Sequence, residues 1–156
     1  MESTMIPSAL YHVAEIELVY KTKVKASERP HIKSSSDAYE VLKQSWDENK
    51  IEFVEQFKVM LLNRANKVLG IYELSTGGIS GTVADIRLIF AASIKSNASS
   101  IVLAHNHPSS NTKPSDADLL LTHKIKEAGK LLDIKVIDHI IVTIESYYSF
   151  ADQGEI

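Results

Sequence analysis

The sequence predicts one α/β domain of the α+β kind, in which helices flank a mixed sheet. Three observations support this fold class. The chain has 156 residues, enough for one domain with an adequate core. Apolar residues recur at strand spacing in some segments and at helical spacing in others. The predicted strands and helices are interspersed along the chain, and no internal repeat interrupts them.

The composition limits the classes of function. Hydrophobic residues make up 44% and charged residues 24% of the chain, as in ordinary globular proteins. The net charge of −3 gives no general attraction for nucleic acid. Neither a signal peptide nor an apolar run long enough to span a bilayer is evident. We therefore expect a soluble, cytoplasmic protein with no membrane partner and with weak nucleic-acid binding at most, and its oligomeric state stays open.

The N-terminal part is predicted to be an arm followed by a first strand. Residues 1–12 show no periodicity and are expected to be loose. Residues 14–25 alternate apolar and polar side chains, which predicts a strand. The apolar positions are Ile16, Leu18 and Tyr20. Residues 21–33 contain five Lys or Arg against one Glu, and we interpret them as a solvated strand end rather than a phosphate-binding track.

The main domain, residues 35–156, follows the arm and strand of residues 1–34. It is predicted to begin with a helix over residues 35–50, which Ser35 or Ser36 would cap. The side chains expected to share one face of this helix are Ala38, Val41, Leu42 and Ser45, and Trp46 would dock its end against the core.

A hairpin, a helix and a buried strand are predicted next. Residues 55–63 and 67–75 indicate two antiparallel strands. The glycine-rich turn TGGISG that follows lacks the GK[ST] ending of a phosphate loop. Residues 84–97 have helical spacing, and the short apolar run of residues 99–104 is typical of a strand buried on both faces. The residues that share the helical face are Ile86, Ile89, Phe90 and Ser93.

Two further segments complete the predicted fold. A helix is expected to begin after Ser115, a good N-cap, with one stripe of side chains against the core. The stripe consists of Leu121, Ile125, Ala128 and Leu132. Residues 134–150 predict one or two more strands.

The stretch HNHPSSNTKPSDAD, between the buried strand and the last helix, predicts a metal site. The chain has no cysteine, which excludes disulfides and leaves His, Asp, Glu or water as ligands. Side chains two residues apart in an extended segment point the same way, so His105 and His107 can aim at one point. Pro108 ends the strand, and the following turn brings Asp118 back over the strand end. Two His and one carboxylate leave a zinc position for water, which is the catalytic pattern.

The alternative is that the histidines are ordinary loop residues and that Asp118 complements the helix dipole. The preceding strand, the proline and the capped helix that carries the acid favour the metal. A non-haem iron enzyme remains open on the ligands alone. A zinc deaminase is disfavoured because the chain has neither H-x-E nor a cysteine pair.

The same stretch resembles the H-x-H-P…S-x2-D signature of the JAMM (MPN) metalloprotease superfamily, in its RadC-like branch. The segments EQFKVMLLNRANKVLG and IKVIDHIIVT are also similar to that branch, and the resemblance covers roughly residues 35–154. It implies a JAMM/MPN-type domain with a mixed, mostly antiparallel sheet. It also implies a Zn²⁺-dependent peptidase or isopeptidase with a peptide or protein substrate.

The resemblance assigns roles to individual residues. The metal ligands would be His105, His107 and Asp118. Glu55 matches the family glutamate that activates water, and Glu52 is the fallback for this role. Ser115 matches the serine that helps to bind the oxyanion, although its alternative role is the helix N-cap.

Two features depart from the family pattern. Ser110 stands where the branch usually has a glycine, and a positive φ there would cost about 1 kcal/mol. Residues 1–34 do not resemble the helix-hairpin-helix region of longer RadC-like proteins, so a link to DNA repair rests on the family name only. His139 resembles a family position, but a hydrogen bond in or near the core is the more typical role. The alternative function is a non-catalytic MPN-type binding module, against which the complete ligand set argues.

Overall fold

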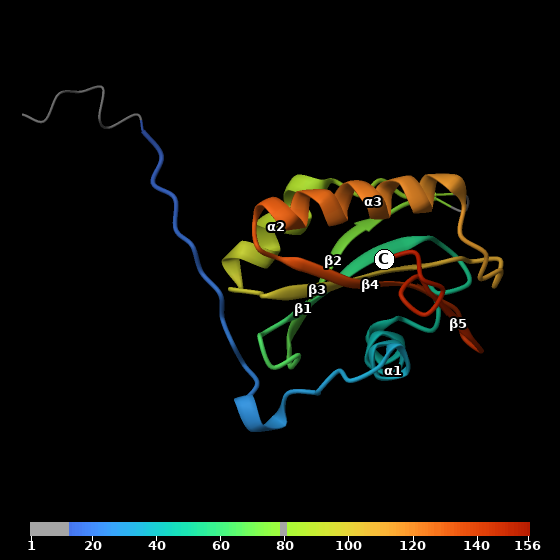
Figure 1. The fold of residues 1–156 in the computed structure, drawn as a ribbon, viewed down its shortest axis with the longest axis horizontal. Helices are drawn as coiled ribbons and strands as arrows, with labels where there is room; N and C mark the ends of the chain where they lie inside the picture. Colours follow the sequence, from blue (N-terminus) through green and yellow to red (C-terminus); the bar gives the residue numbers. More distant parts are fainter. Residues whose placement is uncertain (1–12, 79–80) are drawn as a thin grey trace, which may run out of the picture.

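A five-stranded sheet separates one helix from two others in the part of the chain that the computed structural model describes, residues 13–78 and 81–156. The strands are β1 (Gln56–Leu62), β2 (Val68–Thr76), β3 (Ser100–Asn106), β4 (Lys135–Val142) and β5 (Tyr147–Ser149). The helices are α1 (Ser35–Ser45), α2 (Ile86–Lys95) and α3 (Asp116–Leu131), with a short 3₁₀ turn, η2 (Ala26–Glu28). Figure 1 shows α2 and α3 on one face of the sheet and α1 on the other.

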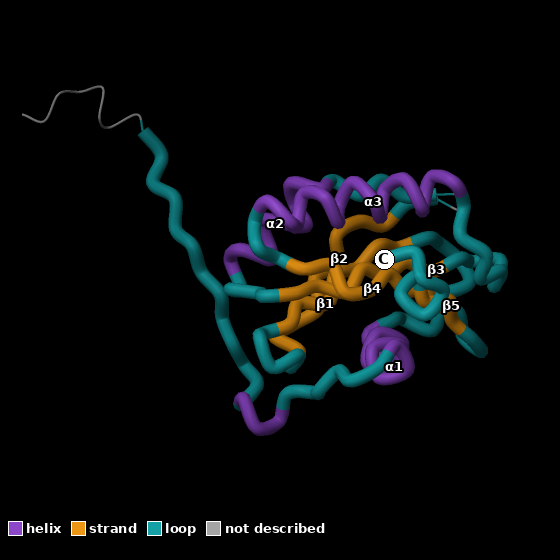
Figure 2. Tube along the Cα trace, viewed as in Figure 1, coloured by secondary structure: helices purple, strands orange, loops and turns teal. Residues whose placement is uncertain are grey.

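The sheet is mixed and mostly antiparallel, which confirms the predicted fold class. Its strand order is β2-β1-β3-β4-β5. Antiparallel pairing joins β1 to β2, β1 to β3 and β4 to β5, whereas β3 and β4 are parallel. A parallel pair needs a crossover connection, and α3 supplies it (Figure 2).

Each face of the sheet carries its own core. Every residue of β1 and β3 is buried, because helices cover both faces of these strands. Met60 and Leu62 lie on the α1 face with Leu42, and Val59 lies on the opposite face with Ile89 of α2. The prediction of a central strand buried on both faces is therefore confirmed.

The first helix has an earlier N-cap than predicted, and it ends at Ser45 rather than at residue 50. The hydroxyl of Ser34 caps α1 by accepting the N–H of Asp37, so the choice of Ser35 or Ser36 is wrong. The reason is that the Ser35 hydroxyl is hydrogen-bonded to Asp152 instead, at 2.6 Å. The buried side chains of α1 are Ala38, Tyr39 and Leu42, whereas Ser45 is exposed. Trp46 is buried beyond the end of the helix, as predicted.

The other two helices largely match their predictions. In α2, Ile89, Phe90 and Ser93 are buried. In α3, Ser115 is the N-cap and Ile125 is fully buried, but Leu132 lies beyond the helix and is 45% exposed. The buried face of α3 includes the small or polar Thr122 and Gly129, which an apolar stripe cannot predict. No helix in the described ranges has the length and apolar character needed to cross a membrane.

The strand predicted over residues 14–25 does not form within the chain. Its side chains are exposed, and it pairs with no strand of the described sheet. The chain enters the domain near His31, which forms an antiparallel bridge with Lys67, and the preceding residues contact β2 through the Tyr20 side chain without a backbone pair. An alternating pattern specifies a strand only where a neighbouring strand is available. The loose arm predicted for residues 1–12 lies outside the described residues.

Candidate metal centre

The three predicted metal ligands come together where β3 ends and α3 begins. His105 is the penultimate residue of β3, His107 follows the strand, and Asp118 lies in the first turn of α3. His105 Nε2 lies 3.0 Å from His107 Nε2 and 3.4 Å from Asp118 Oδ1. His107 Nε2 lies 3.5 Å from Asp118 Oδ2. His105 is buried, and the other two side chains are partly buried.

A chain of hydrogen bonds behind His105 determines which ring nitrogen carries its proton. The Thr122 hydroxyl donates its only proton to the main-chain oxygen of Asp118, 2.6 Å away, because a carbonyl can only accept. Thr122 Oγ1 therefore accepts Nδ1–H of His139, also at 2.6 Å. His139 Nε2 is then unprotonated and accepts Nδ1–H of His105 at 2.8 Å. The lone pair of His105 Nε2 consequently faces the centre.

The ring of His139 is held between aromatic neighbours in the core. It is fully buried and stacks on Phe150, with ring centroids 4.6 Å apart. Burial lowers the pKa of His139 well below its usual value, so the ring is neutral and can both donate and accept. The predicted core hydrogen bond of His139 is thus present, and its partners connect it to the candidate ligands.

The second histidine is oriented by the loop that follows it. His107 Nδ1 lies 2.6 Å from the main-chain oxygen of Asn111 and donates to it, since a carbonyl has no proton to give. His107 Nε2 therefore also keeps its lone pair. A hydrogen bond from one ring nitrogen to a carbonyl is the usual arrangement behind a metal-binding imidazole.

The donor atoms fit a tetrahedral metal ion. Ligands 2.0–2.2 Å from zinc at the corners of a tetrahedron are about 3.3–3.6 Å apart, and the observed separations are 3.0, 3.4 and 3.5 Å. Two lone pairs and one carboxylate converge here, and a cation would relieve their mutual repulsion. Three protein ligands leave a fourth position open, which is the pattern of a catalytic site.

The electrostatics of the centre also favour positive charge. Burial acts to raise the pKa of Asp118, but the interactions of its carboxylate with the neighbouring His105 and His107 rings outweigh it and hold that pKa far below its usual value. The Asp118 carboxylate in turn raises the pKa of His107 against the effect of burial. Asp118 is therefore ionised across the physiological pH range.

A buried asparagine joins the end of β3 to the segment that carries Glu55. Asn106 Oδ1 accepts the main-chain N–H of Gln56 at 2.7 Å. Its Nδ2 donates to the main-chain oxygens of Ile51 and Val54, at 2.7 and 2.9 Å. The side chain turned away from the two histidines therefore positions the loop before β1. Sequence reasoning missed this role.

Glu55 and two of the candidate ligands, His107 and Asp118, line one cavity of about 510 Å³. Glu55 is partly buried, whereas Glu52 on the same wall is exposed. Burial raises the pKa of Glu55, and the neighbouring His105 and His107 act to lower it. The other residues that line the cavity are Gly81, Thr82, Pro108, Ser109, Ser115 and Ala117.

The glycine-rich turn forms another wall of this cavity. Glu55 pairs with it through its main chain, donating to Gly78 and accepting from Gly77. A Cβ atom at Gly77 would collide with Gly81 and Thr82, so the close approach of this turn requires glycine. The glycines thus have a structural role beside the candidate centre.

Ser115 can act as a helix cap and still donate a hydrogen bond. Its Oγ accepts the N–H of Asp118 at 3.1 Å, and its own N–H donates to Asp118 Oδ2 at 2.8 Å. Capping uses a lone pair and leaves the hydroxyl proton free, so the two roles of Ser115 are compatible.

One residue in the loop between His107 and α3, Ser110, has a backbone conformation that glycine favours. Ser110 has a φ of 63°, and its N–H donates to the His107 carbonyl at 2.9 Å. Ser110 therefore has the positive φ that is expected to cost about 1 kcal/mol of stability for a residue other than glycine.

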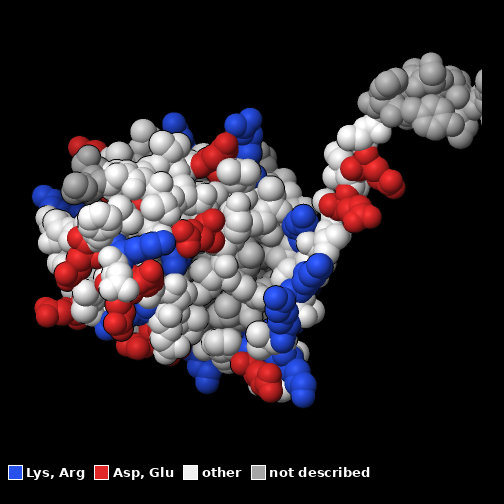
Figure 3. All heavy atoms as spheres, turned by 180° about the vertical axis from the view of Figure 1, so that it is seen from behind, with Lys and Arg blue, Asp and Glu red and all other residues white. Residues whose placement is uncertain are grey.

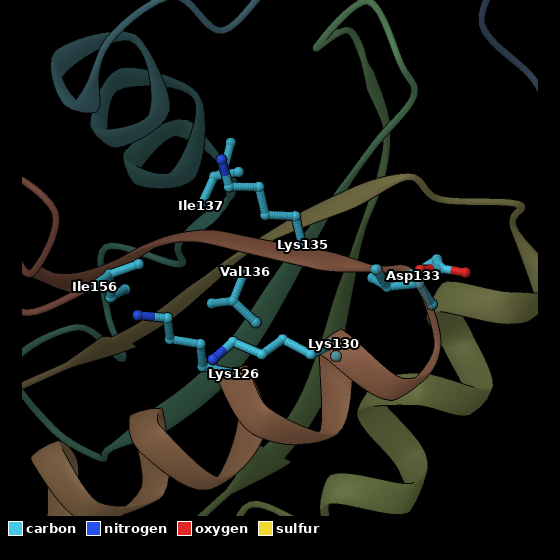
Figure 4. Close-up of a pocket in the computed structure, with 9 residues that line it drawn as sticks. Lys126, Lys130, Asp133, Lys135, Val136, Ile137 and Ile156 are labelled. Carbon is cyan, nitrogen blue, oxygen red and sulfur yellow. The ribbon is translucent and has the colours of Figure 1, made fainter.

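Another cavity, of about 630 Å³, lies away from the candidate centre. Lys126 and Lys130 of α3 and Lys135 of β4 surround it, with Val136 and Ile156 forming apolar walls (Figure 4). Ammonium groups do not bind metal cations while charged, so this cavity offers no second candidate centre.

The fold and the site define a single mixed α/β domain with a possible metal site at the end of its central strand. A family model for the RadC-like JAB domain matches residues 32–155, which is most of the chain. The chain therefore belongs to the RadC-like JAB domain family, and the resemblance found in the sequence is confirmed.

Curated relatives carry the name UPF0758 protein. The one from Flavobacterium johnsoniae is 45% identical over 123 residues, covering 79% of this chain and 52% of that protein. The one from Porphyromonas gingivalis is 44% identical over 101 residues, covering 64% of this chain and 44% of that protein. The one from Alkaliphilus metalliredigens is 38% identical over 123 residues, covering 79% of this chain and 52% of that protein. The chain thus spans about half the length of the curated relatives it matches.

Proposed function

We propose that the protein is a Zn²⁺-dependent hydrolase that cleaves an amide bond of a peptide or protein, an isopeptide bond included. The observation that carries the proposal is the convergence of two histidine lone pairs and one carboxylate at the wall of a cavity that Glu55 and Ser115 also line. A bound zinc ion would act as a Lewis acid and lower the pKa of a coordinated water toward about 7.

The metal ligands and Glu55 would have separate roles in hydrolysis. His105, His107 and Asp118 would hold the metal, with the imidazoles oriented by the hydrogen bonds behind them. The Glu55 carboxylate would accept a proton from the attacking water and pass it to the leaving amine. Its raised pKa favours the second of these transfers, because a weaker acid holds the proton until the amine takes it.

Ser115 would bind the oxygen of the scissile amide. Its hydroxyl lines the cavity and is fixed by the N–H of Asp118, which leaves its proton to donate. A donor held in this way stabilises charge that develops on oxygen without reorganising.

The decisive experiment compares Glu55→Gln with Glu52→Gln in zinc-supplemented protein. Both residues line the same cavity, and both changes keep the side-chain shape. We expect Glu55→Gln to retain zinc and to lower turnover about 10²–10⁴-fold, and we expect Glu52→Gln to behave like the wild type. The measurements are metal content and cleavage of a peptide and isopeptide library with and without chelator.

Each other result would change the proposal in a defined way. A requirement for Glu52 but not for Glu55 would show that the base is misassigned. Wild-type protein that binds no metal would support the non-catalytic binding module. Iron in place of zinc would point to a non-haem iron enzyme.

A further inference from the structure

The segment of residues 13–25 exposes apolar side chains to water, and it alone is called the arm from here on. Ile16 is 84% exposed and Leu18 is 79% exposed. Figures 1 and 2 show the arm as an extended trace beside the sheet. The Tyr20 hydroxyl donates to the Leu69 carbonyl of β2 at 2.6 Å, so the arm contacts the domain near the edge strand. An extended segment with exposed apolar side chains and unpaired backbone groups is suited to pairing with another strand.

Side chains of the arm divide into two faces with different chemistry. In an extended chain, alternate residues share a face. One face carries Glu15, Glu17, Val19, Lys21 and Lys23. The other carries Ile16, Leu18, Tyr20, Thr22 and Val24. The charged face is acidic in its first half and basic in its second, and Figure 3 shows the acidic group toward the grey end and a basic row toward the domain.

This charge order is complementary to itself in the antiparallel direction. If two arms pair with Val19 opposite Val19, Glu15 faces Lys23 and Glu17 faces Lys21. A twofold axis repeats both pairs, so every one of these charges faces an opposite charge. A parallel pair in register would place like charges opposite each other and is disfavoured.

We propose that two copies of this chain associate through their arms, which form an antiparallel two-stranded ribbon centred on Val19. The apolar face of the ribbon needs cover, because an isolated two-stranded ribbon is only marginally stable in water. A groove of about 410 Å³ beside the arm provides such a surface. Tyr20 lines it together with Leu88 of α2 and Tyr72 of β2, which are 46% and 36% exposed.

The other possible occupant of the edge of β2 is the arm of the same chain. In the structure the arm contacts that edge through the side chain of Tyr20, but no backbone hydrogen bond joins residues 13–25 to β2. The charges also favour a second copy, since β2 carries Glu73 but no basic residue to pair with Glu15 and Glu17. The second copy is therefore the partner that the arm fits best.

The test measures the oligomeric state of the full chain by sedimentation equilibrium over the micromolar range. We expect the wild type to dimerise. Glu15→Lys/Glu17→Lys and Lys21→Glu/Lys23→Glu should each weaken self-association about tenfold or more, because each gives the four paired positions 15, 17, 21 and 23 the same charge. An equimolar mixture of the two variants should form heterodimers, because a basic arm then faces an acidic one.

The matched control for Glu15→Lys/Glu17→Lys is Glu40→Lys/Glu48→Lys, which makes the same change in net charge at two exposed residues of the domain body. It should dimerise like the wild type. Circular dichroism verifies that every variant is folded, since the arm lies outside the core. A monomeric wild type, a dimer that both arm variants leave unchanged, or variants that fail to associate when mixed would each overturn the proposal.

Discussion

The state of His105 depends on a threonine that does not touch the candidate metal position. Thr122→Val removes the acceptor of the His139 proton, and His139 can then move that proton to its other nitrogen. The proton would be donated to His105 Nδ1, which forces the His105 proton onto Nε2 and blocks its lone pair. We expect zinc affinity to fall about 10–100-fold, measured by competition with a chromogenic chelator.

The control for this prediction is Thr122→Ser, which keeps the hydroxyl and should keep most of the zinc affinity. Nitrogen chemical shifts of the imidazoles provide a second readout, because they report the tautomer directly. If Thr122→Val changed stability but neither zinc affinity nor the His105 tautomer, Thr122 would have a packing role only.

Replacing Ser110 by glycine tests how much stability the positive φ at this position costs. Its φ of 63° is in the left-handed region, and its side chain is exposed. We expect Ser110→Gly to raise the free energy of unfolding by up to about 1 kcal/mol, because the relief of strain exceeds the entropy that glycine adds to the unfolded chain. Urea unfolding with unchanged m-value measures the effect.

The neighbouring residue provides a control of opposite sign. Ser109 is also exposed but has no positive φ. Ser109→Gly should lower the free energy of unfolding by about 0.5–1 kcal/mol, since glycine adds flexibility there and removes the hydroxyl that accepts the N–H of Asn111 at 3.4 Å. If both changes destabilised the protein equally, the strain at Ser110 would be negligible.

At the scale of elements, Asn106 connects β3 to the loop that precedes β1. Asn106→Ala removes three buried hydrogen bonds and should cost about 2–4 kcal/mol of stability. Because the freed loop carries Glu55, we also expect turnover to fall in the molecules that remain folded. Zinc content should stay unchanged, because His105 keeps its bond to His139. Kinetics and metal analysis below the unfolding temperature separate these effects.

Asn63→Ala is the matched control for Asn106→Ala. Asn63 Oδ1 accepts the main-chain N–H groups of Ala65 and Lys67 in the β1–β2 hairpin, away from the cavity. It should reduce stability but leave turnover per folded molecule unchanged. Equal losses of turnover in the two variants would show that stability, rather than the position of Glu55, determines activity.

Local patterns predicted the elements that local physics controls. The hairpin, α2 and β3 follow from periodicity, and the approach of His105 to His107 follows from the alternation of side chains along an extended chain. The bonds of Asn106 to Gln56 and of Thr122 to His139 could not be predicted in this way. They join residues that are distant in sequence, and only the sheet register brings these residues together.

The strand predicted over residues 14–25 failed for a related reason. Its alternation is real, but a strand also needs a partner, and the chain itself does not supply one. The helix cap at Ser34 rather than Ser35 depends on the contact between Ser35 and Asp152 at the other end of the chain. Both errors are therefore failures to predict tertiary contacts, not errors of periodicity.

At the scale of the whole molecule, the candidate centre lies outside the two cores that hold the fold. The cores pack α1 on one face of the sheet and α2 with α3 on the other, and the centre lies where β3 meets α3. The apo protein should therefore be folded, unlike small zinc domains whose folding requires the metal. Metal binding would then add stability to a domain that already exists.

The last prediction measures this added stability. A ligand that binds only the folded state stabilises it by about 2.7 kcal/mol at a free concentration of 100 times Kd. We therefore expect zinc to raise the melting temperature of the wild type and a chelator to reverse the change. His105→Ala should remain folded but lose this response, because the centre then has only His107 and Asp118. The control is His123→Ala on the exposed side of α3, which should keep the full response. An equal zinc response in wild type and His105→Ala would place the metal elsewhere, and unfolding of the wild type by chelator would contradict the independence of the cores.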